Sequence, residues 1–174
     1  MKVLWWNIFG PHPLLDQNET YKNILELSKF HEHLFLGEYD PNLFSKNKKN
    51  ELLKTHPNFL FFKHKKRPDG IAVFSKTPIE ISKTYYQSTE SFYLETTLKN
   101  KNILITHLRH NWHTLKEKEG LIGVIKIFFG NMTKNNSLIN KQCEELLPII
   151  KHKDIIFGDM NTFPSFFGIN SSLY

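Results

Sequence analysis

Polar residues that can handle a phosphate and a metal ion stand at the ends of several short apolar runs. Asn7 closes VLWWN, Glu38 closes LFLGE and His107 closes ILITH. Asp159 and Asn161 follow another apolar run in the segment IIFGDMN. Such runs are typical of buried strands, and α/β enzymes place their chemistry at strand ends.

These side chains suit a hard divalent cation beside a phosphate. Mg²⁺ takes one or two carboxylates and leaves its other positions to water and phosphate oxygens. Neutral amide and imidazole groups can hold the anion where further carboxylates would repel it. Each residue also has a simpler interpretation, since Asp159 can cap a helix, Asn7 can satisfy a turn and His107 can be a hydrogen-bonded buried histidine. The hypothesis therefore depends on the set, and on strands that share one layer.

The surrounding residues predict the elements that must position this set. Runs rich in β-branched and aromatic residues predict strands, and apolar residues at helical spacing predict helices. Strands are expected at residues 2–7, 34–38, 58–62, 70–75, 79–86, 91–98, 102–108 and 154–159. Helices are expected at residues 18–33, 50–56, 114–129 and 137–151, with Asn18 as the N-cap of the first and Pro148 near the end of the last.

The order of these elements predicts the fold class. The turns between residues 58 and 108 are short, so neighbouring strands there are expected to form antiparallel hairpins. Helices separate the other strands. Mixed pairing with covering helices predicts a mixed-sheet α/β sandwich, formed by residues 1–174 as a single domain.

The composition sets further bounds. The 174 residues are 40% hydrophobic, which indicates a globular core that needs no disulfide or metal staples. The single cysteine, Cys143, excludes an internal disulfide and favours a reducing compartment. We expect a cytoplasmic protein, because the sequence shows neither a signal peptide nor a run of about 20 apolar residues. The net charge of +6 favours either an anionic partner or simple solubility.

Five segments together carry a family resemblance. KVLWWN, LFLGE, RPDGIAVFSKTPI, ILITHL and IIFGDMN occur in this order along essentially the whole chain. In this the chain resembles the endonuclease/exonuclease/phosphatase superfamily, whose members are deoxyribonuclease-like, Mg²⁺-dependent phosphoesterases. The resemblance implies the α/β sandwich of that superfamily.

The resemblance also implies a role for each candidate. Glu38 resembles the glutamate that ligates Mg²⁺, or Mn²⁺ in its place, and Asn7 resembles the first-strand asparagine that lies beside the metal and the phosphate. The resemblance therefore implies that both residues bind the metal and that Asn7 also binds the phosphate. His107 resembles the histidine that contacts the phosphate or protonates the leaving group. Asp159 resembles the aspartate that orients or deprotonates the attacking water, and Asn161 its phosphate-holding companion. Physically, the metal would offset phosphoryl charge while the carboxylate activates water.

The segment after His107, HLRHNWH, offers further candidates. Arg109 could bind phosphate through its guanidinium or form an ion pair with Glu117 or Glu119. His107, His110 and His113 stand at a spacing of three, but without a nearby cysteine a solvated loop is favoured over a zinc site. The basic run of Lys63, Lys65, Lys66 and Arg67 fits either a phosphate backbone or a solvated turn.

The chain departs from the superfamily pattern near its end. The superfamily closes with a further strand and a Ser-Asp-His-type motif, whereas TFPSFFGINSSLY, after Asn161, contains no histidine. We therefore expect a C-terminally incomplete domain, lacking the final strands, in which neither His110 nor His113 replaces the missing residue.

Three functions remain open from the sequence. The first is a Mg²⁺-dependent hydrolase of a phosphodiester, in nucleic acid or a similar substrate, or of a phosphomonoester. The second is a non-catalytic or truncated relative that binds metal or phosphate without turnover. The third is a fragment that folds poorly alone. No obligate protein partner is evident.

Overall fold

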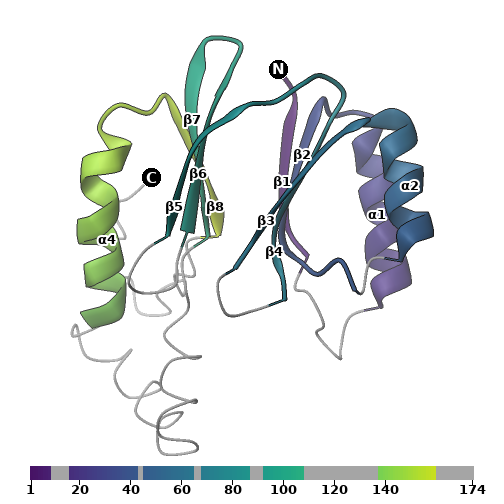
Figure 1. Cartoon of the computed structure of the whole chain (residues 1–174), viewed down its shortest axis with the longest axis horizontal. Helices are drawn as coiled ribbons and strands as arrows, with labels where there is room; N and C mark the ends of the chain where they lie inside the picture. The colour runs from purple at the N-terminus through teal and green to yellow at the C-terminus, as the bar shows by residue number, and fades with distance from the viewer. Residues whose placement is uncertain (9–15, 43–44, 65–67, 87–91, 108–136, 160–174) are drawn as a thin grey trace, which may run out of the picture.

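The structure is a computed structural model that describes residues 1–8, 16–42, 45–64, 68–86, 92–107 and 137–159. In these residues, two four-stranded sheets face each other (Figure 1). Helices α1 (Gln17–Ser28) and α2 (Lys46–Thr55) cover the outer face of one sheet, and α4 (Ser137–Ile150) covers the outer face of the other. The arrangement confirms the predicted mixed-sheet α/β sandwich.

The first sheet has the order β1-β2-β4-β3. Strands β1 and β2 are parallel, and β4 pairs antiparallel with both β2 and β3. Because β4 returns between them, β2 and β3 end at the same edge of the sheet. The strands are β1 (Val3–Asn7), β2 (His33–Tyr39), β3 (Asn58–Lys63) and β4 (Gly70–Ser75).

The second sheet has the order β5-β6-β7-β8. Strands β5, β6 and β7 pair antiparallel, as their short connections predict, and β8 runs parallel to β7. The hairpin expected between β4 and β5 is wrong, because the connection between them crosses from one sheet to the other. The parallel step follows α4, which occupies the crossover. The strands are β5 (Ile81–Tyr86), β6 (Phe92–Leu98), β7 (Lys101–His107) and β8 (Ile155–Asp159).

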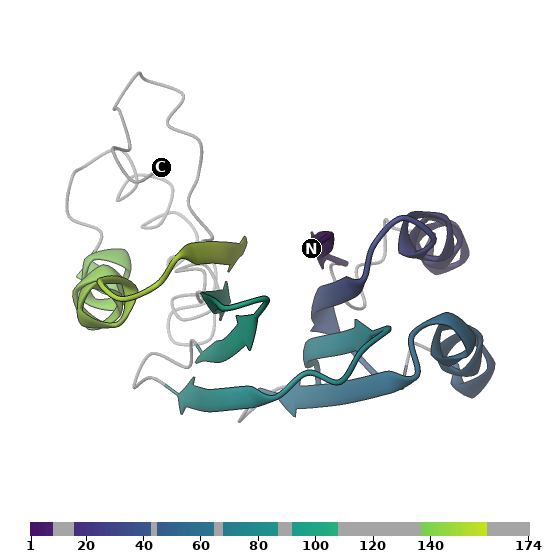
Figure 2. The same ribbon diagram turned by 90° about the horizontal axis from the view of Figure 1, so that it is seen from above.

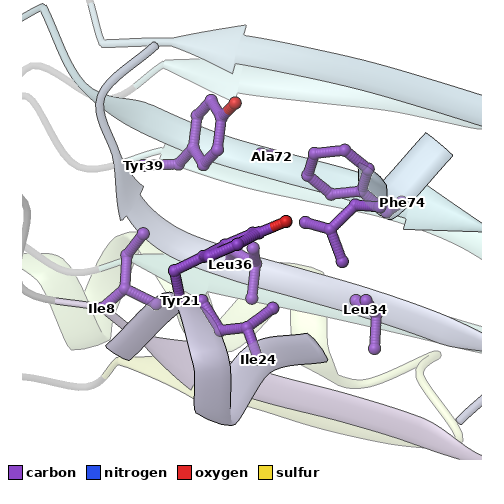
Figure 3. Close-up of a cluster of buried hydrophobic side chains, with 9 residues drawn as sticks. Ile8, Tyr21, Ile24, Leu34, Leu36, Tyr39, Ala72 and Phe74 are labelled. Atoms are coloured by element: carbon purple, nitrogen blue, oxygen red, sulfur yellow. The ribbon is translucent and has the colours of Figure 1, made fainter. Parts of the chain in front are cut away.

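Both faces of the central strands are covered, which explains why they read as apolar runs rather than as alternating patterns. In β2, Leu34 and Leu36 face the helices, whereas Phe35 faces the other sheet. Figure 3 shows the helix-side cluster, in which Ile24 of α1 packs with Leu34 and Leu36. Burial of each such side chain contributes about 1.5–3 kcal/mol.

Phe157 packs between the two sheets, near the C-terminal end of β8. Its ring centroid lies 6.3 Å from that of Trp5 in β1 and 5.3 Å from that of Phe35 in β2. Figure 2, the view from above, shows β8 facing β1 across the sandwich. The inner face of β8 is therefore fixed against the opposite sheet.

The N-cap of helix α1 lies two residues before the predicted one. Asp16 is its N-cap, because the side-chain Oδ1 accepts hydrogen bonds from the backbone N–H groups of Asn18 at 2.8 Å and Glu19 at 3.3 Å. The choice of Asn18 as the cap is wrong. Asp and Asn are about equally favoured as N-caps, so cap preference did not distinguish Asp16 from Asn18. The spacing of the apolar residues did not distinguish them either.

Helix α4 seals the second sheet. Leu146 packs on Tyr93 of β6 and Leu104 of β7, the outward-facing residues of those strands. Pro148 lies near the helix end, as predicted. The helix expected at 114–129 lies outside the described residues. In the part of the chain that the structure describes, no helix combines the length and the apolar character needed to cross a membrane.

Candidate active site

Four of the predicted site residues come together, but not in one layer. Asn7 closes β1 and lies in register with Gly37 of β2, while His107 closes β7 and lies in register with Asp159 of β8. The strands belong to different sheets, so the supposition of a shared layer is wrong. The residues meet across the sandwich, because each parallel strand pair ends at the same edge of its sheet.

Side-chain alternation places three of these residues on the inner face. Asn7 follows Val3 and Trp5 at a spacing of two, and both pack in the core between the sheets. His107 stands in the same relation to Ile103 and Ile105, and Asp159 to Ile155 and Phe157. The three polar side chains therefore lie on the same inner faces as the core residues, at the end of the sandwich where β1, β7 and β8 end.

Glu38 reaches this face through a β-bulge. Regular alternation after Leu34 and Leu36 would turn Glu38 towards the helices. Instead, β2 pairs Leu36 with Ala72 and Tyr39 with Gly70, so Gly37 and Glu38 together oppose a single residue of β4. Glu38 has a φ of 54°, a left-handed conformation that costs a non-glycine residue about 1–3 kcal/mol. The bulge redirects the carboxylate towards the opposite sheet.

The polar atoms of these four residues form a connected group. The Asn7 amide donates from Nδ2 to Oδ2 of Asp159, and the same nitrogen lies 3.5 Å from Oε1 of Glu38. Nε2 of His107 lies 3.6 Å from Oε1 of Glu38. The His107 side chain is 2% exposed and that of Glu38 is 19% exposed, so the site is open on the carboxylate side.

Gly158 explains the glycine of the segment GDMN. Its φ of 143° is accessible to glycine but rarely to other residues. A Cβ atom there would lie 1.9 Å from the carbonyl oxygen of Thr106 on the neighbouring strand. Glycine therefore lets β8 approach β7 closely enough to set Asp159 beside His107.

The donor set fits a hard divalent cation. One ligand atom each from Glu38, His107 and Asp159 lies within 4.8 Å of the others. Two carboxylates this close and partly buried repel each other, and a cation would offset that repulsion. The carboxylates are the oxygen ligands Mg²⁺ prefers, whereas the Asn7 nitrogen faces them as a hydrogen-bond donor. The ligand role expected of Asn7 stays a prediction.

Tyr39 borders the site but belongs to the core. It follows Glu38 and packs with the rings of Phe61 and Phe74, with centroids 5.7 Å and 6.0 Å away. Burial, together with the charge of Asp40, raises the pKa of Tyr39 to about 12. The phenol is therefore neutral at pH 7 and cannot serve as a base there.

The sequence analysis missed His64. It directly follows β3, is 7% exposed, and its Nε2 lies 3.1 Å from Nδ1 of His107. Two rules could have found it: His64 stands at a strand end, and it follows the inner-face residue Phe62 at a spacing of two. The surrounding lysines instead suggested a solvated turn.

The remaining candidates lie outside the described residues. They are Arg109, His110, His113, Asn161 and the basic residues Lys65, Lys66 and Arg67. Lys63, at the end of β3, is exposed.

The layers, the strand order and the placement of the polar residues define the class of fold. Comparison with solved structures confirms that the chain has the fold of the endonuclease/exonuclease/phosphatase superfamily. No protein-family model and no curated protein sequence matches the chain.

Three similar solved structures illustrate the likeness. TDP2 of D. rerio, complexed with a single-strand DNA product, has a TM-score of 0.56 at 16% identity, covering 94% of this chain and 61% of that one. The human Nocturnin catalytic domain with bound sulfate has a TM-score of 0.53 at 18% identity, covering 95% and 65%. A β-hairpin deletion mutant of beta toxin from Staphylococcus aureus has a TM-score of 0.55 at 14% identity, covering 94% and 68%. The chain thus spans less than two thirds of the first two structures.

Proposed function

We propose that this protein is a metal-dependent phosphoester hydrolase whose active site is the group Asn7, Glu38, His107 and Asp159. The observation that carries the proposal is the convergence of two carboxylates, an amide and an imidazole from both sheets at one end of this fold. We further propose that residues 1–174 act as one domain.

The carboxylates have separate tasks in this proposal. Glu38, redirected by the bulge, would hold Mg²⁺, or Mn²⁺ in its place, with Asp159 beside it. When bound, the cation supplies charge neutralisation on the phosphoryl oxygens and a water of lowered pKa. Asp159 would orient the attacking water and accept its proton, and the Asn7 N–H would hold the Asp159 carboxylate in place.

The neutral donors would bind the anion. His107 presents Nε2 towards the carboxylates and can donate to a phosphate oxygen or to the leaving group. Arg109 and Asn161, which follow β7 and β8 in sequence, are proposed as further phosphate-binding residues. Preorganised donors of this kind stabilise the charge that develops in the transition state.

A phosphodiester, in nucleic acid or a similar substrate, is the proposed substrate class. The net charge of +6 favours a polyanion. One similar structure, TDP2 of D. rerio, holds a single-strand DNA product, and another, Nocturnin, holds a sulfate. A phosphomonoester is the second candidate within the same chemistry.

Binding without turnover is the alternative function. It is favoured by the coverage of the comparisons, because the chain spans 61% of TDP2 and 65% of the Nocturnin domain. A group that the longer chains contain can therefore lie outside this alignment. Under this alternative the protein binds the metal and phosphate but does not hydrolyse the ester.

The test is hydrolysis of bis(p-nitrophenyl) phosphate with Mg²⁺ and with chelator. Glu38→Gln and Asp159→Asn should each lower turnover by about 100- to 10,000-fold. The matched controls are Glu26→Gln and Asp154→Asn, exposed carboxylates whose partners are Lys29 and Asn102. They should leave turnover unchanged. Turnover that persists in chelator, or in both site variants, would overturn the proposal, and Mn²⁺ binding without turnover would establish the alternative.

A further inference from the structure

We propose that His64 is a positioning residue that sets the tautomer of His107, so that His107 is a hydrogen-bond donor at Nε2 rather than a metal ligand. Its catalytic consequence rests on the function proposed above. The proton order itself can be measured without any turnover.

His64 is held in a fixed position beside His107. Its backbone N–H donates to the carbonyl oxygen of Asp69 at 2.9 Å, which joins the two sides of the β3–β4 connection. The strands are tightly apposed there, because a Cβ on Gly70 would lie 2.0 Å from the carbonyl oxygen of Phe62. His64 and Asp69 are 7% and 3% exposed. The backbone that carries the His64 imidazole is therefore closely packed at the end of β3.

The two rings meet through a nitrogen pair. Nε2 of His64 lies 3.1 Å from Nδ1 of His107, a hydrogen-bond distance. The ring centroids are 4.9 Å apart and the ring planes are inclined by 66°. Between two neutral imidazoles, one of these nitrogens carries the shared proton and the other accepts it.

Glu38 decides which nitrogen that is. The other ring nitrogen of His107, Nε2, lies 3.6 Å from Oε1 of Glu38. A proton on Nε2 is attracted to the carboxylate, whereas a lone pair there faces negative charge. The favoured order is therefore His64 Nε2–H donating to His107 Nδ1, and His107 Nε2–H directed at Glu38.

This order separates the roles within the group of three potential ligands. A protonated Nε2 cannot coordinate a cation, so the metal is left to the carboxylate side of the group, where Glu38 is its proposed ligand. The N–H of His107 is left to bind an oxygen of the substrate. His64 thus acts on the reaction through His107, in the way that a partner hydrogen bond fixes the tautomer of a functional histidine.

The first test is nitrogen-15 NMR of the imidazoles in the metal-free full chain, with His107 assigned by its loss in His107→Gln. The proposal expects the proton of His107 on Nε2 and that of His64 on Nε2. A proton on Nδ1 of His107 overturns it, whether or not the protein hydrolyses any ester.

The second test compares two variants of His64 that differ in whether the side chain can donate a hydrogen bond. His64→Leu removes the donor, and His64→Gln retains an N–H donor near the same position. His64→Leu should mix the His107 tautomers and lower kcat by about 10- to 100-fold. His64→Gln should restore the Nε2–H tautomer and most of the turnover.

Mn²⁺ affinity, measured calorimetrically, shows whether His107 acts as a hydrogen-bond donor or as a metal ligand. It should match the wild-type value in His64→Leu and fall in Glu38→Gln, which removes the carboxylate proposed to hold the metal. Equal losses in both would show that His107 binds the metal, and would overturn the proposal. An unchanged tautomer in a His64→Leu protein that unfolds cooperatively would do the same.

Discussion

The two ends of the sandwich each bury a pair of histidines, and the pairs differ in what they touch. At the site end, His64 contacts His107, which faces the Glu38 carboxylate. At the opposite end of β2, His33 is 4% exposed and His56 is fully buried. Nδ1 of His33 lies 2.8 Å from Oγ of Ser75, and Nδ1 of His56 lies 2.9 Å from Oγ1 of Thr55.

The comparison separates burial from function. Hydroxyl and carbonyl partners satisfy His33 and His56 without adding charge, and burial lowers the pKa of both. These two residues behave as neutral parts of the core. At the site end the partners include carboxylates that could also hold a cation. A buried histidine therefore indicates chemistry through its partners and not through its burial.

The largest expected effect is the loss of turnover when the site-end histidine His107 is replaced. His107→Gln should lower the hydrolysis of bis(p-nitrophenyl) phosphate by about 100- to 10,000-fold, because the glutamine amide cannot protonate the leaving group as an imidazole can. His33→Gln, the matched change at the opposite end, should leave turnover within about twofold of wild type. Steady-state kinetics on both variants check this, and equal losses would mean that the two ends do not differ.

The backbone at the site end includes a position, Gly158, that other residues tolerate poorly. Gly158→Ala places a Cβ against the Thr106 carbonyl and forces alanine to a φ of 143°, so it should reduce the free energy of unfolding by about 3 kcal/mol or more. Ile156→Ala, two residues earlier at an exposed position, should cost about 1 kcal/mol. Urea denaturation measures both, and an equal cost would remove the strain argument.

The opposite end should govern stability in mildly acidic solution. Burial holds the pKa of His33 and of His56 below the ordinary value of 6.5, and the charge of Lys76 lowers that of His56 further. Below pH 6.5 the unfolded chain therefore binds protons that the folded chain does not. The free energy of unfolding should fall as the pH decreases from 6.5, by at most about 1.4 kcal/mol per pH unit for each histidine.

Urea denaturation at pH 7.5 and pH 5.5 checks this sign. The double variant His33→Gln with His56→Gln should lose most of the pH dependence between these values. A wild-type protein that is more stable at pH 5.5 than at pH 7.5 would contradict the prediction.

The smallest effect tests whether position near the site is enough to make a polar residue functional. Asp16 caps α1, the helix that follows Asn7 along the chain. Asp16→Ala should lower stability by about 1 kcal/mol and leave turnover unchanged. Asn18→Ala, whose side chain accepts from Lys48 at the surface, should cost a few tenths of that amount. Thermal unfolding with parallel rate measurements distinguishes the two.

Much of the fold followed from local pattern. The apolar runs located all eight described strands, and the short turns predicted the antiparallel pairing of β3 with β4, of β5 with β6 and of β6 with β7. The same rule was wrong for β4 and β5, which lie in different sheets. Strand-end position selected Asn7, His107 and Asp159, because their place and their inner-face alternation are both local properties. The cap of α1 was misplaced by two residues, since Asp and Asn compete equally there.

The rest depended on tertiary structure. The assignment of strands to two sheets is a long-range choice that no run of residues specifies. Glu38 was selected from its place at the end of an apolar run, but alternation alone would have turned it towards the helices, because the bulge appears only in the pairing of β2 with β4. His64 was missed because four basic residues surround it in the segment KHKKRP, and their charge predicted exposure to solvent where the fold buries the side chain.

The division of the sandwich has one more consequence. Residues up to Ser75 build the first sheet and residues from Ile81 build the second, so within the described residues the chain crosses between the sheets once. Each half carries part of the site, with Asn7, Glu38 and His64 on one and His107 and Asp159 on the other. A chain cut within residues 76–80 would leave each piece with only part of the proposed site, so hydrolysis that appears only when the pieces are mixed would show that they reassemble. The two halves of the chain are therefore suited to a fragment-complementation assay.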